Sequence, residues 1–260
     1  MIITPMLRWP LLMAALVLGA CAAEKSDVRV INASTAFYEV PGRTNGTAVE
    51  PIAQHAGRGV LILHGGGVIT EDVTRLIVAH SGPEPTLCLI DTADPGQGQI
   101  YRLFDSYSGV HLRVFDLEAR DVALPDVVKS LGSCTGYFFG GGAPQRLSEA
   151  FRPGGRDSPA LAAIRARFEQ HGAVVSGSSA GAMIVGPVTL CECGEHSSVT
   201  AVRSGELFKA PGFALLQAPV LVDAHFFVRG LLGRHMFALA RDGLPVGVGI
   251  DEGAAVLVPG

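Results

Sequence analysis

Short apolar runs without internal polar alternation recur through most of this chain, and amphipathic stretches separate them. Strands that are apolar on both faces are typical of a parallel sheet covered by helices on both sides. At 260 residues, the chain is long enough for one such domain. We therefore expect a single-domain α/β fold with a Rossmann-like, mostly parallel sheet and helices on both faces. The predicted strands are residues 60–64, 86–91, 112–115, 136–139 and 172–176, and the predicted helices are residues 70–80, 97–108, 124–131 and 159–171.

The first twenty residues have a different character. Arg8 gives them a positive charge, residues 11–18 are apolar but too short to cross a bilayer, and small residues surround Cys21. This pattern resembles a bacterial lipobox, in which the cysteine is acylated. We expect residues 1–20 to be a lipoprotein signal peptide and the protein to be exported and lipid-anchored to a bacterial membrane through Cys21. An ordinary cleaved signal peptide is the alternative.

Residues 21–58 are polar and rich in turn-forming residues, so we interpret them as a tether and peripheral segment and place the organised domain at residues 59–260. The net charge is −4, and Lys and Arg are scattered along the chain. Such a chain lacks the basic surface that neutralises phosphates, so we expect no nucleic-acid partner.

Four further cysteines follow Cys21 in a chain whose predicted compartment permits disulfides. Cys88 and Cys134 lie in apolar runs and are interpreted as small buried hydrophobic residues. Cys191 and Cys193 lie near His196, but a structural zinc site needs two separated ligand pairs. We expect a disulfide involving one of these two cysteines rather than a metal site, and no cofactor.

Three glycine-rich loops follow predicted strands, at residues 64–67, 140–142 and 177–181. Ligands of parallel sheets bind at the carboxyl ends of strands, and glycines there let a substrate approach the backbone. The third loop has Ser179 between Gly177 and Gly181, which is the pattern of a nucleophile elbow. We expect Ser179 to be the nucleophile and the N–H groups of Ala180 and Gly141 to stabilise an oxyanion.

A serine nucleophile needs a base and an acid that orients the base. His225 ends an apolar run, whereas His235 lies in a predicted helix and His64 is compatible with a structural strand end. For the acid, Asp251 and Glu252 close another apolar run, and core packing does not explain adjacent carboxylates.

These motifs, in this order, resemble the cyanophycinases of the S51 serine peptidases, which are related to dipeptidase E. The resemblance covers roughly residues 59–258, and the serine and histidine blocks carry it in combination. It implies a class I glutamine-amidotransferase-like fold, a hydrolase domain at residues 59–260, and a triad of Ser179, His225 and Glu252. It also implies substrate contacts from Gln145, Asp223, Arg229 and Arg234. Because Arg229 and Arg234 can pair with a carboxylate, we expect an acidic peptide substrate, with aspartyl or β-aspartyl peptides favoured. A homodimer is compatible with the sequence.

The chain departs from the cyanophycinase pattern near the expected substrate site. Ala224 replaces the usual glutamine before the histidine, Leu231 stands where a further arginine is usual, and the loop before Gln145 lacks an aspartate. These changes retain the chemistry of the triad and put the specificity for cyanophycin, an aspartate polymer with arginine side chains, in doubt. The sequence stops at Gly260, soon after Glu252, where relatives continue into a final strand, so we also expect a short or truncated chain.

Two other functions are compatible with parts of the pattern. The His-Gly-Gly-Gly of residues 64–67 resembles the oxyanion loop of α/β-hydrolase esterases, but that fold places its acid before its histidine. A surface-anchored binding protein would explain the altered substrate residues but not an intact triad.

Overall fold

The computed structural model describes residues 37–52, 57–95, 99–191 and 198–260. A seven-stranded sheet forms its centre, in the order β1-β4-β3-β5-β6-β2-β11. The five inner strands are parallel, and both edge strands are antiparallel to their neighbours. These strands are β1 (Phe37–Val40), β2 (Leu61–His64), β3 (Thr86–Ile90), β4 (His111–Phe115), β5 (Gly136–Phe139), β6 (Val174–Ser178) and β11 (Ala255–Val258).

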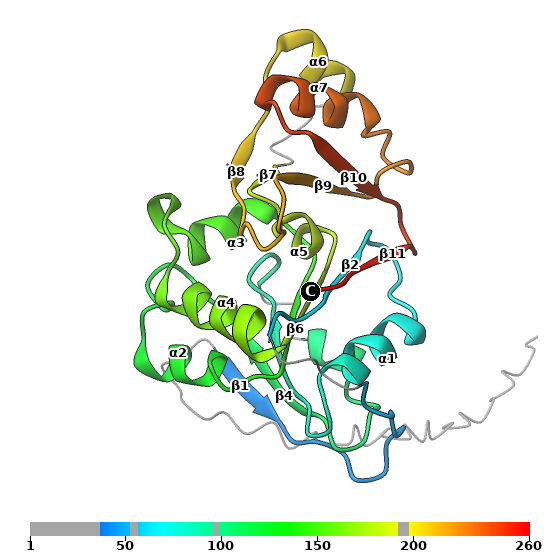
Figure 1. The fold of residues 1–260 in the computed structure, drawn as a ribbon, viewed down its shortest axis with the longest axis vertical. Helices are drawn as coiled ribbons and strands as arrows, with labels where there is room; N and C mark the ends of the chain where they lie inside the picture. The colour runs from blue at the N-terminus through cyan, green and yellow to red at the C-terminus, as the bar shows by residue number, and fades with distance from the viewer. Residues whose placement is uncertain (1–36, 53–56, 96–98, 192–197) are drawn as a thin grey trace, which may run out of the picture.

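Helices cover both faces of this sheet, as predicted (Figure 1). One face packs against α2 (Pro125–Leu131), α3 (Pro144–Phe151) and α4 (Pro159–His171). The other packs against α1 (Glu71–His80) and the short 3-10 helix η1 (Ile100–Leu103). The parallel sheet with buried faces thus follows from strands that are apolar throughout.

Helix α4 shows how closely local signals define an element here. Ser158 accepts a hydrogen bond from the N–H of Leu161, Pro159 occupies the first helical position, and Gly172 ends the helix with φ of 70°. A serine cap, proline at the first turn and a left-handed glycine are the usual boundary signals of a helix. The predicted range, 159–171, is the observed one.

Three elements differ from the sequence expectation. The predicted helix at residues 97–108 is reduced, within the described residues, to η1, because glycines precede it and Asp105, Ser106 and Ser108 favour turns. Helix α3 was not predicted, because the glycine and proline residues around it indicated a loop. Strand β1 lies in the segment assigned as a tether, so the ordered sheet starts before the expected boundary at Gly59.

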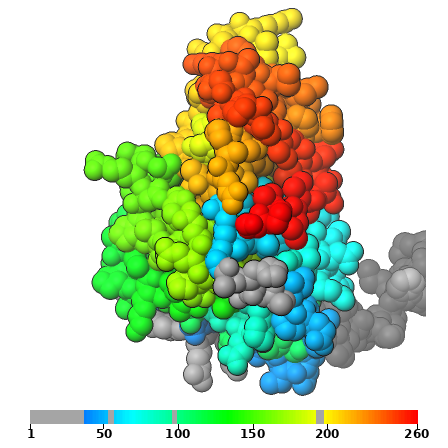
Figure 2. Space-filling view, in the orientation of Figure 1, coloured from blue at the N-terminus to red at the C-terminus, as the bar shows by residue number. Residues whose placement is uncertain are grey.

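The chain after β6 builds a second layer at one end of the molecule (Figure 1). Figure 2 shows this part, coloured yellow to red, as one continuous end. The layer has its own small core around Leu221 and Ala238. Helix α5 (Ala180–Met183) packs on β6 and leads into this layer. The layer contains the antiparallel pair β7 (Val188–Leu190) and β8 (Lys209–Pro211), α6 (Ser198–Ser204), the parallel pair β9 (Val220–Ala224) and β10 (Val246–Ile250), and α7 (Leu232–Asp242). The chain then returns to the main sheet as β11, so a strand does follow the predicted acid.

Candidate active site

Ser179 lies on a sharp turn between β6 and α5. Its φ is 54° and its ψ is −117°, which is strained for a residue with a side chain. The flanking glycines make the turn possible, because a Cβ on Gly177 would overlap the backbone of Gly181, and one on Gly181 would overlap the carbonyl of Phe139. The local geometry is that of a nucleophile elbow. The helix after it, α5, is a single turn.

His225 joins this serine to a carboxylate. It follows the end of β9, with φ of 53°, and is 8% exposed. Its Nε2 lies 2.7 Å from Oγ of Ser179, and its Nδ1 lies 2.5 Å from Oε1 of Glu252. Because an ionised carboxylate only accepts hydrogen bonds, Nδ1–H donates to Glu252 and Nε2 accepts from the serine hydroxyl. The three side chains are therefore aligned for proton transfer away from Ser179.

The two adjacent carboxylates after β10 have different partners. Glu252 meets His225, whereas Oδ1 of Asp251 accepts hydrogen bonds from the N–H groups of Phe227 and Val228, each at 3.1 Å. These backbone bonds, chiefly that from Val228, lower the pKa of Asp251, and burial opposes the shift. Asp251 therefore fixes the loop that follows His225.

The loop after β2 supports the histidine and the acid from the other side. Gly66 has φ of 100°, and a Cβ there would overlap the imidazole of His225. A Cβ on Gly67 would lie 3.1 Å from Oε2 of Glu252. These glycines allow the backbone to pack directly on the two side chains, which is a different role from the oxyanion loop of an esterase.

His64 fixes this loop to the serine strand. Its Nδ1 accepts the N–H of Gly66 at 3.2 Å and lies 3.0 Å from Oγ of Ser178. Since a backbone N–H can only donate, Nδ1 is unprotonated. Burial, followed by the nearby His225, lowers the pKa of His64 and favours this neutral form.

The predicted oxyanion donors lie beside the serine. Ala180 is the residue directly after Ser179, at the start of α5. A Cβ on Gly141 would lie 3.3 Å from Cβ of Ser179, so the second glycine loop passes close to the nucleophile. The structure thus brings together all three glycine loops that the sequence analysis selected.

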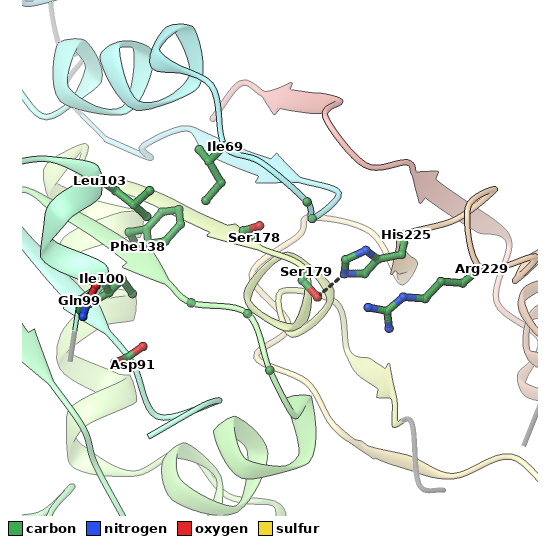
Figure 3. A pocket seen from close by; sticks show the side chains of 15 residues that line it. Ile69, Asp91, Gln99, Ile100, Leu103, Phe138, Ser178, Ser179, His225 and Arg229 are labelled. Atoms are coloured by element: carbon green, nitrogen blue, oxygen red, sulfur yellow. Dashed lines mark hydrogen bonds between the residues drawn. The ribbon is translucent and has the colours of Figure 1, made fainter. Parts of the chain in front are cut away.

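A cavity of about 460 Å³ opens beside Ser179 (Figure 3). Arg229 approaches from the layer that carries His225, and Asp91 lies at the opposite end in this view. The wall between them is largely glycine and apolar side chains. The lining residues are Gly66, Gly67, Ile69, Asp91, Gln99, Ile100, Leu103, Phe138, Gly140, Gly141, Gly142, Ser178, Ser179, His225 and Arg229.

Among the four predicted substrate contacts, Arg229 alone lines this cavity. Asp223 and Arg234 instead form a buried ion pair with two hydrogen bonds, of 2.7 and 3.2 Å. Asp223 is 0% exposed and Arg234 is 6% exposed, so the pair joins α7 to β9 and does not face a substrate. Gln145 lies in the first turn of α3, outside the cavity lining.

Sequence reasoning missed Asp91, Gln99 and the apolar wall. The rule that ligands bind at the carboxyl ends of strands could have identified Asp91, because it ends the apolar run 86–91 at the same sheet edge. Ile100 and Leu103 were placed in a longer helix, which hid their position at the cavity. His235 lies in α7 as predicted, is 3% exposed and packs edge-on against Phe226.

Cys88 and Cys134 are buried, as expected, but they are not free thiols. They form a disulfide, with Cα atoms 6.0 Å apart, between β3 and the segment that enters its neighbour β5. Cys191 is buried, while Cys21, Cys193 and His196 lie outside the described residues, so the lipidation prediction and the predicted disulfide there stay predictions. Within the described ranges, His, Cys, Asp and Glu side chains form no group of three suited to a metal ion. No helix in that part of the chain is long and apolar enough to span a membrane.

Comparisons with known proteins agree with the resemblance seen in the motifs. The chain is 30% identical over 162 residues to a cyanophycinase of Nostoc sp., covering 60% of this chain and 50% of that protein. It is 27% identical over 209 residues to a cyanophycinase of Synechococcus elongatus, covering 76% and 62%. The chain thus spans half to somewhat under two thirds of these relatives. No protein-family model matches it.

Solved structures show the same fold. A peptidase from an acI-B1 Actinobacterium superposes with a TM-score of 0.57 at 20% identity, covering 79% of this chain and 85% of that one. A putative peptidase E protein from Listeria monocytogenes superposes with a TM-score of 0.50 at 15% identity, covering 78% and 95%. The chain therefore shares an α/β fold with these structures and is similar in sequence to cyanophycinases over part of their length.

Proposed function

We propose that this protein is a serine peptidase that hydrolyses amide bonds of short peptides through an acyl-enzyme. The observation that carries the proposal is the continuous chain of hydrogen bonds from Ser179 through His225 to Glu252. A strained serine on an elbow, bonded to a histidine that a carboxylate orients, is the arrangement that activates a hydroxyl for acyl transfer. The similarity to cyanophycinases supports this reaction class.

In the proposed mechanism, Nε2 of His225 takes the proton of Ser179 as Oγ attacks the amide carbonyl. Glu252 stabilises the imidazolium that forms, and the N–H groups of Ala180 and Gly141 stabilise the tetrahedral oxyanion. His225 then gives its proton to the leaving nitrogen, and the C–N bond breaks to leave an ester on Ser179. Water, deprotonated by His225, attacks the ester, and the acid product leaves with the serine restored.

Arg229 is the group proposed to bind a substrate carboxylate. It lines the cavity beside His225, and a guanidinium presents a planar pair of donors to a carboxylate. This supports aspartyl or β-aspartyl peptides as substrates. Because Asp223 and Arg234 bind each other in a buried ion pair, fewer polar side chains contact the substrate than the resemblance implies.

We further propose that the protein is exported and anchored through Cys21. The disulfide between Cys88 and Cys134 supports export, because such bonds persist in oxidising compartments and are rare in reducing ones. Growth with labelled palmitate followed by purification tests the anchor. Incorporation that Cys21→Ser abolishes is expected, and equal labelling of both forms would contradict it.

The activity is tested with a fluorophosphonate probe and with a panel of Asp-X and β-Asp-X dipeptides. We expect covalent labelling of Ser179, located by mass spectrometry, and hydrolysis that Ser179→Ala abolishes. His225→Ala should lose both signals while the protein stays folded by circular dichroism. Labelling or hydrolysis that persists in Ser179→Ala would refute the assigned nucleophile, and a folded wild type that neither labels nor hydrolyses would favour a binding protein.

A further inference from the structure

We propose that Asp91 forms a subsite for a cationic group of the substrate, at the end of the cavity opposite Arg229. The inference rests on the proposed function for the identity of the substrate as a peptide. It adds a specificity that neither the triad nor the carboxylate-binding role of Arg229 supplies.

Asp91 is fixed where a parallel sheet binds its ligands. It follows β3 at the carboxyl edge, its N–H donates to the carbonyl of Phe115 at 2.8 Å, and its carbonyl accepts from the N–H of Asp94 at 3.0 Å. These bonds hold the backbone, so the direction of the side chain is set by the fold.

Asp91 lines the cavity although the residue is only 7% exposed. A Cβ on Gly140 would lie 3.5 Å from its Oδ1, so a side chain at position 140 would contact this oxygen. Glycine at that position adds no side-chain atoms beside the carboxylate. A charge that is removed from bulk water acts on a ligand with less screening than one on the surface.

The neighbours of Asp91 in the cavity make its charge more selective. Ile69, Ile100, Leu103 and Phe138 line the same cavity and lie on the same side of Ser179 as Asp91 (Figure 3). These apolar side chains can pack against the methylene groups of a ligand. They offer no hydrogen-bond donor or positive charge to a carboxylate of the ligand. The pKa of Tyr38 is raised first by burial and next by the negative charge of Asp91. Asp91 therefore acts electrostatically on groups near it.

The cavity therefore has a carboxylate at one end, a guanidinium at the other and the nucleophile between them. In Figure 3, Asp91 and Arg229 lie on opposite sides of Ser179. A peptide that presents a cationic nitrogen to Asp91 and a carboxylate to Arg229 satisfies both ends. The nitrogen is either a free α-ammonium group or the end of a Lys or Arg side chain, and both have the same charge chemistry.

Four peptides separate these two sources: Asp-Lys, Asp-norleucine and their N-acetyl forms. Norleucine removes the side-chain ammonium, and acetylation removes the α-ammonium. We expect wild type to prefer at least one cationic peptide over its neutral partner in kcat/KM, and Asp91→Asn to reduce that preference roughly 10- to 100-fold. The matched control is Asp94→Asn, an exposed aspartate three residues away that does not line the cavity and should keep the wild-type preference.

A second readout keeps this test independent of turnover. Calorimetric titration of the same peptides into Ser179→Ala and into Ser179→Ala/Asp91→Asn measures binding alone. A cationic preference that the second variant loses supports the subsite, and a preference retained without Asp91, or none in its presence, overturns it. Failure of the proposed hydrolase shows separately, as absence of fluorophosphonate labelling and of hydrolysis for every peptide.

Discussion

The backbone of Gly66 lies directly against the imidazole of His225. A Cβ built on Gly66 would lie 2.8 Å from Nδ1 of His225 and would overlap the rest of the ring. The position of the proposed base therefore depends on the absence of a side chain in a different loop.

Gly66→Ala should displace His225 from Ser179 and reduce kcat about 100-fold, since misplacement by about 1 Å has effects of that size. Gly109→Ala is the matched control, because Gly109 also has positive φ, of 71°, but nothing lies within 4 Å of its Cβ position. Steady-state kinetics and thermal unfolding separate the two effects. Equal losses of activity in both variants would show that backbone strain, and not contact with His225, is responsible.

Arg234→Met should destabilise the protein by about 3–5 kcal/mol, because it removes the guanidinium that pairs with the buried carboxylate of Asp223. The double variant Asp223→Asn/Arg234→Met should recover much of this stability. Urea unfolding measures both. Arg229→Gln, at the cavity, should leave unfolding unchanged and raise KM for peptides that carry a carboxylate. A raised KM with full stability in Arg234→Met would restore its role in substrate binding.

The Cys88–Cys134 disulfide closes a loop of 46 residues, so Cys88→Ala/Cys134→Ala should lower the free energy of unfolding by about 4 kcal/mol. The bond lies away from the cavity, and activity per folded molecule should not change. Reduction of the wild type with dithiothreitol should lower its stability by a similar amount. A reductant-insensitive wild type would argue that the bond is not formed.

The lowered pKa of His64 predicts a loss of stability in mild acid. Above its ordinary value of 6.5, His64 is neutral in both the folded and the unfolded protein. As the pH falls below 6.5, the unfolded chain takes up a proton that the folded protein does not, so stability declines until the folded pKa is reached. In His64→Asn, an amide oxygen replaces the acceptor Nδ1 without titrating. Urea unfolding between pH 7.5 and 5.5 should show a smaller decline for this variant, with an equal decline contradicting the assignment.

Asp251 should act in a lower pH range. Its pKa is lowered in the folded protein, so its contribution to stability is complete above the ordinary value of 3.8 and is lost as the pH falls through the folded pKa. Asp251→Asn should therefore be less stable than wild type near pH 6, and the two should converge in strong acid. Urea denaturation curves of both proteins, measured near pH 6 and in strong acid, test this difference in stability. A constant difference across the range would show that packing, not charge, makes the contribution.

Local signals in the sequence were enough to predict the inner strands and the residues at their ends. Ser179 and His225 each follow an apolar run, and the rule that ligands bind at the carboxyl ends of strands selects both without knowledge of strand order. The choice of Glu252 over its neighbour Asp251 came from the resemblance to a family, and the structure supplies its geometric reason.

Features that depend on which strands are neighbours could not be predicted this way. The disulfide joins β3 to the approach of β5, which are adjacent in the sheet although β4 lies between them in the chain. Likewise, a sequence with Asp223 and Arg234 gives the same pattern whether the two face a substrate or each other. The distinction requires knowing that α7 packs on β9.

The nucleophile and its base belong to different sheets: Ser179 extends from the seven-stranded sheet, whereas His225 and Glu252 follow β9 and β10 of a separate pair. The active site therefore forms only when the two layers of the molecule pack against each other. Substitutions where the two layers connect, at residues 184–187 and 253–254, can change how the layers pack without replacing any reacting group. A homologue with all three side chains intact can accordingly differ widely in rate, and retention of those residues is by itself a poor measure of how active such a protein is.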